Sequence, residues 1–201
     1  FKLIYILHGE EGYYIDVLVD LALNSILEES DRDFNQTVVY AKDTPPINVI
    51  DAAARLPMMS EYNVVVVKEA QEYKKNAQWE KFEKYFESPS NSTILIFAHK
   101  YKKFDKRSRI YKLLQKKAGL FESAGVKDYQ LASWISTYVR SKGQAITDKG
   151  IALVAEFVGN DLSRVVNELE KLFIVVPEGT QINEKHIEKH IGISKDYNVF
   201  E

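Results

Sequence analysis

Four consecutive valines at residues 64–67 constrain the fold of this chain more than any other feature. A strand with one face in water alternates apolar and polar residues, so an unbroken β-branched run predicts a strand covered on both faces. Residues 93–97 form a second run of this kind. Strands buried on both faces are typical of parallel sheets enclosed by helices. We therefore expect an α/β domain.

Short apolar segments alternate with helix-length patterns along the first part of the chain. This alternation predicts βαβ units and a mainly parallel, five-stranded sheet flanked by helices. The expected strands are residues 2–7, 37–40, 64–67, 93–97 and 119–122, and the expected helices are residues 13–27, 49–53, 76–86 and 108–117.

The pattern changes after residues 123–125, where helical periodicity continues without a convincing strand. We expect helices at residues 129–138, 151–158, 162–176 and 183–191. The sequence thus predicts an α/β domain over residues 1–125 and a small all-helical domain over residues 126–196.

Two adjacent methionines lie in the loop just before the valine strand. Pro57 should end the preceding helix near Leu56, because proline lacks a backbone donor and restricts the residue before it. Met58 and Met59 then occupy positions where loops usually carry polar residues. Methionine adapts to irregular apolar pockets, so we interpret the loop as a docking device for another molecule. The alternative is that both methionines close the core of this protein.

Composition limits the chemistry and the location of the chain. It contains no cysteine, which excludes disulfides, thiolate metal sites and a cysteine nucleophile, and fits a reducing cytosol. No run of eighteen apolar residues and no leader pattern occurs, so we expect a cytoplasmic protein without a membrane segment. Because the first residue is phenylalanine, the natural start of the chain can lie further upstream.

The net charge is −2, yet residues 100–117 carry nine basic side chains and one acidic one. Aromatic residues interleave with these charges, a combination that can bind a nucleic-acid backbone. A charge run is also common on a solvated or protein-facing surface. The residues we assign to DNA or partner contact are Lys100, Lys102, Lys103, Lys106, Arg107 and Arg109.

The glycine turn at residues 8–14 follows a strand and precedes a helix, where a phosphate-binding loop would lie. Such a loop needs a lysine for the phosphates and a hydroxyl for magnesium. Here Glu10 and Glu11 would repel a triphosphate. His186 and His190 have helical metal-ligand spacing but lack a visible third ligand, so we favour a solvated helix. We predict no catalytic residue, cofactor or metal.

Several motifs in this order resemble the delta subunit of bacterial DNA polymerase III. The resemblance covers the whole chain and rests on the combination of motifs rather than on any one of them. They are residues 5–14 (YILHGEEGYY), 56–61 (LPMMSE), 105–108 (DKRS), 159–163 (GNDLS), 167–172 (NELEKL) and 197–201 (YNVFE).

The resemblance implies an AAA+ fold without ATPase activity, acting in a clamp loader of the polymerase holoenzyme. Such a protein binds the ring-shaped sliding clamp, the beta subunit, and opens it or holds it open. By position, Leu56, Pro57, Met58 and Met59 match the apolar clamp-binding element of the family. The family often has phenylalanine at or beside these methionines, so the Met-Met tip is a departure.

The resemblance also implies that residues 126–196 form a lid domain. Residues 197–201 would begin a third, collar domain that assembles the loader with its ATPase subunits and delta prime. The chain is expected to lack that domain and to be monomeric. Nucleic-acid binding through the basic residues, or an active ATPase, are the alternative functions.

Overall fold

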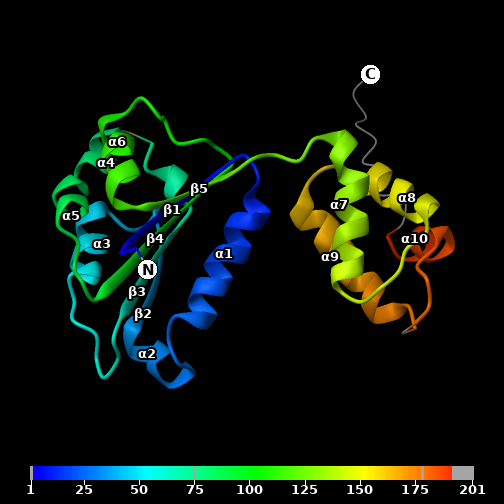
Figure 1. Cartoon of the computed structure of the whole chain (residues 1–201), viewed down its shortest axis with the longest axis horizontal. Coiled ribbons are helices and arrows are strands. Elements are labelled where there is room, and N and C mark those ends of the chain that lie inside the picture. Colours follow the sequence, from blue (N-terminus) through cyan, green and yellow to red (C-terminus); the bar gives the residue numbers. More distant parts are fainter. Residues whose placement is uncertain (1, 75, 178, 192–201) are drawn as a thin grey trace. The chain divides into compact units, whose positions relative to one another are not determined.

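The computed structural model describes residues 2–74, 76–177 and 179–191 (Figure 1). The chain divides into two compact units, Phe1–Gly125 and Val126–Glu201. The expected start of a collar domain at residues 197–201 lies outside the described residues. In the described part, every helix is too short or too polar to cross a membrane.

The first unit alternates strands with helices, as the sequence predicts. Short helical turns that the sequence did not predict are inserted before β2 and after β3. In chain order the elements are β1 (Ile4–Gly9), α1 (Gly12–Ser25), η1 (Glu29–Asp31), α2 (Arg32–Asn35), β2 (Gln36–Tyr40), α3 (Pro46–Ala53), β3 (Asn63–Lys68), η2 (Ala70–Glu72), α4 (Asn76–Glu80), α5 (Glu83–Glu87), β4 (Thr93–Lys100), α6 (Arg109–Lys117) and β5 (Gly119–Ser123).

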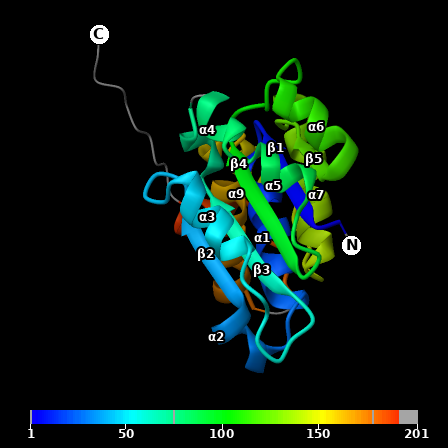
Figure 2. The ribbon, with the colours of Figure 1, turned by 90° about the vertical axis from the view of Figure 1, so that its left-hand side faces the viewer.

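All five strands form one parallel sheet in the order β2-β3-β4-β1-β5, which confirms the predicted sheet. Helices α3 to α6 cover one face and α1 covers the other (Figure 1). Figure 2 shows the sheet from the side of α3 and α5. Because the strands are parallel, the segments before β2 and β3 meet at one end of the sheet, and those after β1 and β4 meet at the other.

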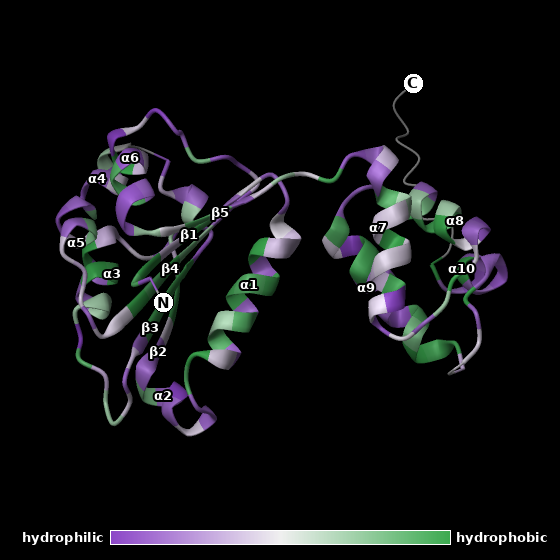
Figure 3. Ribbon diagram, viewed as in Figure 1, coloured by the Kyte–Doolittle hydropathy of each residue, from purple (hydrophilic) through white to green (hydrophobic). Residues whose placement is uncertain are grey.

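The valine run faces both layers of the core, as predicted for a doubly covered strand. Val65 and Val67 pack with the cluster beneath α3 to α6, whereas Val64 and Val66 pack with the cluster beneath α1. All four are fully buried. Strands β3 and β4 are accordingly among the most hydrophobic parts of the ribbon (Figure 3). This strand is a stiff support for the loop that precedes it.

The predicted helix at residues 76–86 is instead two short helices, α4 and α5. The Phe82 N–H donates to the Trp79 carbonyl at 3.0 Å, a tight turn that interrupts the regular ladder. The indole of Trp79 donates to the Tyr73 carbonyl and its ring packs on Phe97 and Phe104. These tertiary contacts fix the two segments separately. The buried face is the same in either arrangement, so the sequence pattern did not reveal the break.

The second unit is helical throughout its regular elements, as expected. Thr147 and Asp161 cap two of its helices by accepting from backbone N–H groups, and Gly159 ends the first of these with a φ of 78°. Such caps satisfy donors that a helix start leaves unpaired. The helices are α7 (Asp128–Ser141), α8 (Asp148–Val158), α9 (Leu162–Val175) and α10 (Glu184–His190).

Candidate protein-docking site

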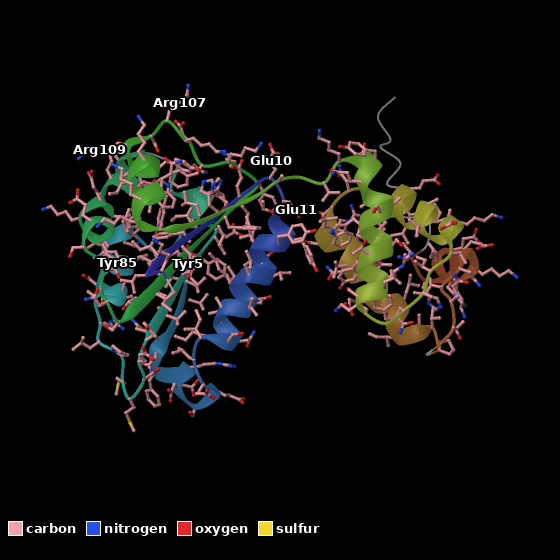
Figure 4. All side chains as sticks on the ribbon, viewed as in Figure 1. Tyr5, Glu10, Glu11, Tyr85, Arg107 and Arg109 are labelled. Atoms are coloured by element: carbon pink, nitrogen blue, oxygen red, sulfur yellow. The ribbon has the colours of Figure 1, made fainter. Side chains whose placement is uncertain are left out.

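Three large apolar side chains project into solvent from the methionine loop, residues 54–62, between α3 and β3. Leu56 is 81% exposed, Met58 60% and Met59 100%, while Pro57 is half-buried. The sulfur atoms, yellow in Figure 4, lie at the tip of this loop. Apolar groups gathered in solvent are typical of a docking surface. The alternative that both methionines close the core is excluded by their exposure.

The backbone at the tip is held by a buried side chain from another element. The Asn35 amide at the end of α2 donates to the Met58 carbonyl at 2.9 Å and accepts from the Met58 N–H at 2.6 Å. Met59 follows with a φ of 57°, in the left-handed region that side chains disfavour. The tip therefore has a defined conformation even though its side chains are in solvent.

The start of the methionine loop is anchored to the core as well. The buried Asn63 amide donates to the Ala52 carbonyl at 3.0 Å, and the Tyr85 hydroxyl donates to the Ala53 carbonyl at 3.3 Å. Both carbonyls belong to the last turn of α3, where the regular helical ladder ends. The loop thus leaves a fixed helix end and enters a buried strand.

Sequence reasoning located the apolar tip but missed Asn35. An asparagine at the end of a short helix is ordinary, and its partner lies 23 positions later in the chain. Phe34, its neighbour on α2, is 70% exposed and was also missed. A large apolar residue in a charged stretch was the available signal for Phe34.

The glycine turn at the other end of the sheet directs its polar groups inward. The Glu10 and Glu11 N–H groups both donate to the Ser123 carbonyl, at 2.9 and 3.4 Å. The Glu11 carboxylate accepts from the Tyr13 N–H at 2.8 Å and caps α1. In a phosphate loop these donors would face the ligand. Here the Glu10 and Glu11 N–H groups already donate to the Ser123 carbonyl, and the group that caps α1 is the negatively charged Glu11 carboxylate.

Most of the predicted basic contact residues form ion pairs with carboxylates of this chain. Within the described ranges, each except Lys102 has such a partner, so much of the positive charge is compensated. Arg107 and Arg109 still project outward from the unit (Figure 4). The pairs are Lys100–Asp16 (2.6 Å), Lys103–Glu10 (3.4 Å), Lys106–Glu122 (2.5 Å), Arg107–Asp105 (3.3 Å) and Arg109–Glu83 (2.7 Å).

Two buried histidines anchor the start of the basic segment, residues 100–117. The His8 Nδ1 accepts from the Phe104 N–H at 3.2 Å, and the His99 Nδ1 lies 3.0 Å from the Lys102 carbonyl. Phe104 is buried among aromatic rings, including Trp79 at 4.7 Å between centroids. Burial lowers the pKa of both histidines below its ordinary value. Neutral rings suit this apolar setting.

His186, one of the two histidines with metal-ligand spacing, takes part in the cap of α10. The His186 Nδ1 accepts from the Asn183 N–H at 3.3 Å and so caps α10. Among the described residues, no group of three or more His, Cys, Asp or Glu side chains could hold a metal ion.

A cavity of about 440 Å³ lies between α1 and the β1–β5 side of the sheet. Its walls are almost entirely apolar, for example Leu18, Leu21 and Phe121.

A comparison with known protein families identifies relatives of this chain. The family described as DNA polymerase III, delta subunit, matches residues 5–124. The chain belongs to this family. A curated relative, DNA polymerase III subunit delta of Bacillus subtilis (strain 168), is 23% identical over 205 residues. The aligned region covers 98% of this chain and 59% of the length of that relative.

Solved structures support an AAA+-like fold. The Bacillus subtilis DNA clamp loader delta protein, YqeN, superposes with a TM-score of 0.72 at 22% identity, covering 96% of this chain and 59% of that protein. A RuvB mutant of Thermotoga maritima gives a TM-score of 0.54 at 13% identity, covering 93% of this chain and 60% of RuvB. The predicted fold class, a five-stranded parallel sheet followed by a helical region, is confirmed.

Proposed function

We propose that this chain binds the sliding clamp of the replicative DNA polymerase through Leu56, Pro57, Met58 and Met59. The full exposure of Met59 on a fixed backbone is the observation that carries the proposal. An exposed apolar side chain breaks few contacts with its own protein when it binds a partner. Its burial in a pocket of that partner is favourable. Membership of the delta-subunit family supports the clamp as that partner.

Opening of the ring follows from differential affinity. A protein that binds the open ring more tightly than the closed ring shifts the population toward the open form. The methionine loop does this without chemistry, because the clamp interface is held by noncovalent contacts. A tip supported by a buried strand keeps its position while the ring deforms.

The chain performs this task without hydrolysing ATP itself. The glycine turn supports this, because Glu10 and Glu11 present negative charge and their N–H groups bond to Ser123. A fluorescent ATP analogue should show no saturable binding to the purified chain. Tight, magnesium-dependent binding of the analogue would contradict this part of the proposal.

Residues 1–125 form the docking domain in this proposal, and residues 126–196 form the lid. Residues 197–201 would start the collar domain, through which the full-length protein joins the ATPase subunits and delta prime. A cytoplasmic location fits this role. These assignments extend beyond the described chain, which spans 59% of the length of its curated relative.

The decisive experiment measures binding of the sliding clamp from the same source by surface plasmon resonance. Met58→Ser/Met59→Ser should weaken binding at least roughly 100-fold, since two apolar anchors are lost. Its thermal melt should stay close to that of the wild type, because both side chains are in solvent. Ile47→Ser, at another exposed apolar residue of the same unit, should bind normally. Equal binding by both variants would contradict the proposal.

We propose the basic segment as a second surface, which binds DNA or a partner only weakly. Lys102 is exposed, and Lys112 and Lys116 lie four apart on the outer face of α6. Because the other predicted cations pair with carboxylates, we expect only weak binding to primed DNA that falls with added salt. Binding that is insensitive to salt would contradict this assignment.

A further inference from the structure

We propose that Asn35 is the positioning residue of the methionine loop and sets the affinity of the tip for the clamp. This inference rests on the proposed clamp-binding function. The Asn35 side chain is only 1% exposed, so it does not contact the clamp itself. It acts through the backbone of Met58.

The Asn35 side chain uses both ends of its amide. Its Oδ1 accepts from the Met58 N–H at 2.6 Å, while its Nδ2 donates to the Met58 carbonyl at 2.9 Å and to the Asp31 carbonyl at 3.1 Å. A donor and an acceptor side by side are needed to hold one residue in this way. At neutral pH, only the amides of asparagine and glutamine carry an acceptor oxygen and a donor nitrogen on the same carbon.

The parallel sheet explains how α2 reaches a loop so distant in sequence. Gln36 of β2 is in register with Val64 of β3. The residues just before both strands therefore lie at the same end of the sheet, and Asn35 immediately precedes β2. Its amide bridges from α2 to the methionine loop across that end.

The conformation of the tip needs such a constraint. Met59 has a φ of 57°, which costs free energy for any residue with a side chain and persists only when neighbouring groups hold it. The two bonds to Met58 fix the residue immediately before this strained position. A tip ordered before binding avoids an entropic cost that a flexible loop incurs when the complex forms.

The test compares clamp binding by Asn35→Ala with binding by the wild type and by Met58→Ser/Met59→Ser. Asn35→Ala leaves every tip side chain in place. We expect it to weaken binding roughly tenfold or more, since ordering even one backbone residue costs about that factor. Hydrogen exchange in the unbound protein should show faster exchange of the Met58 amide, with amides of β3 unchanged.

Asn35→Asp separates positioning from a general structural role. At pH 7.5 the carboxylate still accepts from the Met58 N–H but repels the Met58 carbonyl, so binding should be weak. Because position 35 is buried, the pKa of the new carboxyl group should rise above its ordinary value of about 3.9, and the protonated group restores a donor beside an acceptor. Clamp affinity of this variant, measured relative to the wild type at each pH, should therefore recover as the pH falls toward 5.5. A loss of general stability would not produce such recovery.

The outcomes distinguish this inference from the function on which it rests. If Met58→Ser/Met59→Ser binds the clamp as well as the wild type, the proposed function fails. If that variant loses binding while Asn35→Ala keeps wild-type affinity and slow Met58 exchange, the positioning role of Asn35 is overturned. Asn35→Asp that binds the clamp as tightly as the wild type at pH 7.5 would also overturn it, even if Asn35→Ala failed to fold.

Discussion

At the carboxyl end of the sheet, the segments after β1 and β4 turn their polar groups toward one another and bury Phe104. At the amino end, the loop before β3 leaves Leu56, Met58 and Met59 in solvent. Ligands of open α/β sheets usually bind at the carboxyl end. In this chain that end is filled by its own hydrogen bonds and ion pairs, and the amino end offers the surface for a partner.

The difference shows that an apolar side chain stabilises the fold only where it is buried. Phe104 at the carboxyl end contributes to folding, whereas Leu56, Met58 and Met59 at the amino end contribute little to it and remain available for binding. The two ends should therefore respond in opposite ways to substitution.

Gly9→Ala should have the largest effect. A Cβ at Gly9 would lie 1.9 Å from the Ser123 carbonyl oxygen, and the φ of 147° is unfavourable for alanine. We expect a loss of about 4 kcal/mol or more in the free energy of unfolding, or failure to fold. Gly143→Ala is the control, because it has a positive φ but open space around it, and should cost only about 1 kcal/mol. Urea unfolding compares them.

Phe104→Ala and Met59→Ala contrast the two ends directly. Removal of the buried Phe104 ring leaves a cavity and should lower the free energy of unfolding by about 3 to 5 kcal/mol. Removal of the exposed Met59 side chain should change it by less than about 0.5 kcal/mol. Urea unfolding monitored by circular dichroism measures both. Similar losses for the two variants would contradict the contrast.

Mild acid should weaken the carboxyl end before it affects the amino end. The folded-state pKa values of His8 and His99 lie below the ordinary 6.5, chiefly because of burial, although Glu122 opposes the shift at His8. Below pH 6.5 the unfolded chain therefore binds more protons than the folded chain, and stability falls as the pH decreases. Carboxylates such as Glu122, with a lowered pKa, add to the loss only at lower pH.

The measurement is the urea midpoint at several pH values between 7.5 and 5, together with NMR titration of the two rings. Hydrogen exchange over the same range should show the Phe104 amide losing protection earlier than the Met58 amide. A flat midpoint across this range would contradict the assignment of neutral, buried histidines.

The Lys106–Glu122 pair should have the smallest effect. The Lys106 side chain is 56% exposed and that of Glu122 33%, so solvent screens their attraction. A double-mutant cycle with Lys106→Ala and Glu122→Ala should give a coupling close to the error of urea unfolding, and added salt should remove it. A coupling that persists in high salt would show that the carboxyl end depends on this pair.

Patterns local in the sequence predicted the layers of the fold. The valine run predicted a strand covered on both faces because β-branched residues without alternation have no solvent side. Helical periodicity likewise predicted α8 and α9. The break between α4 and α5 could not be predicted, since Trp79 and Phe82 have the same buried positions with or without it.

The candidate site was predicted in part. Met58 and Met59 stood out because apolar residues in a loop lack a local explanation, but their exposure was undecided until the fold was known. The basic segment looked like one positive surface, because its partners Asp16, Glu83 and Glu122 come from distant parts of the chain.

The sequence by itself determined the strand–helix alternation, the absence of a lysine and of a serine or threonine hydroxyl from the glycine turn, and the apolar character of the methionine loop. Those properties depend on residue type and local order. Only the tertiary structure decided that Asn35 holds Met58 and that Met59 stays in solvent. The reason is that parallel strand pairing brings the segments before β2 and β3 together, and pairing between distant segments leaves no local pattern in the chain.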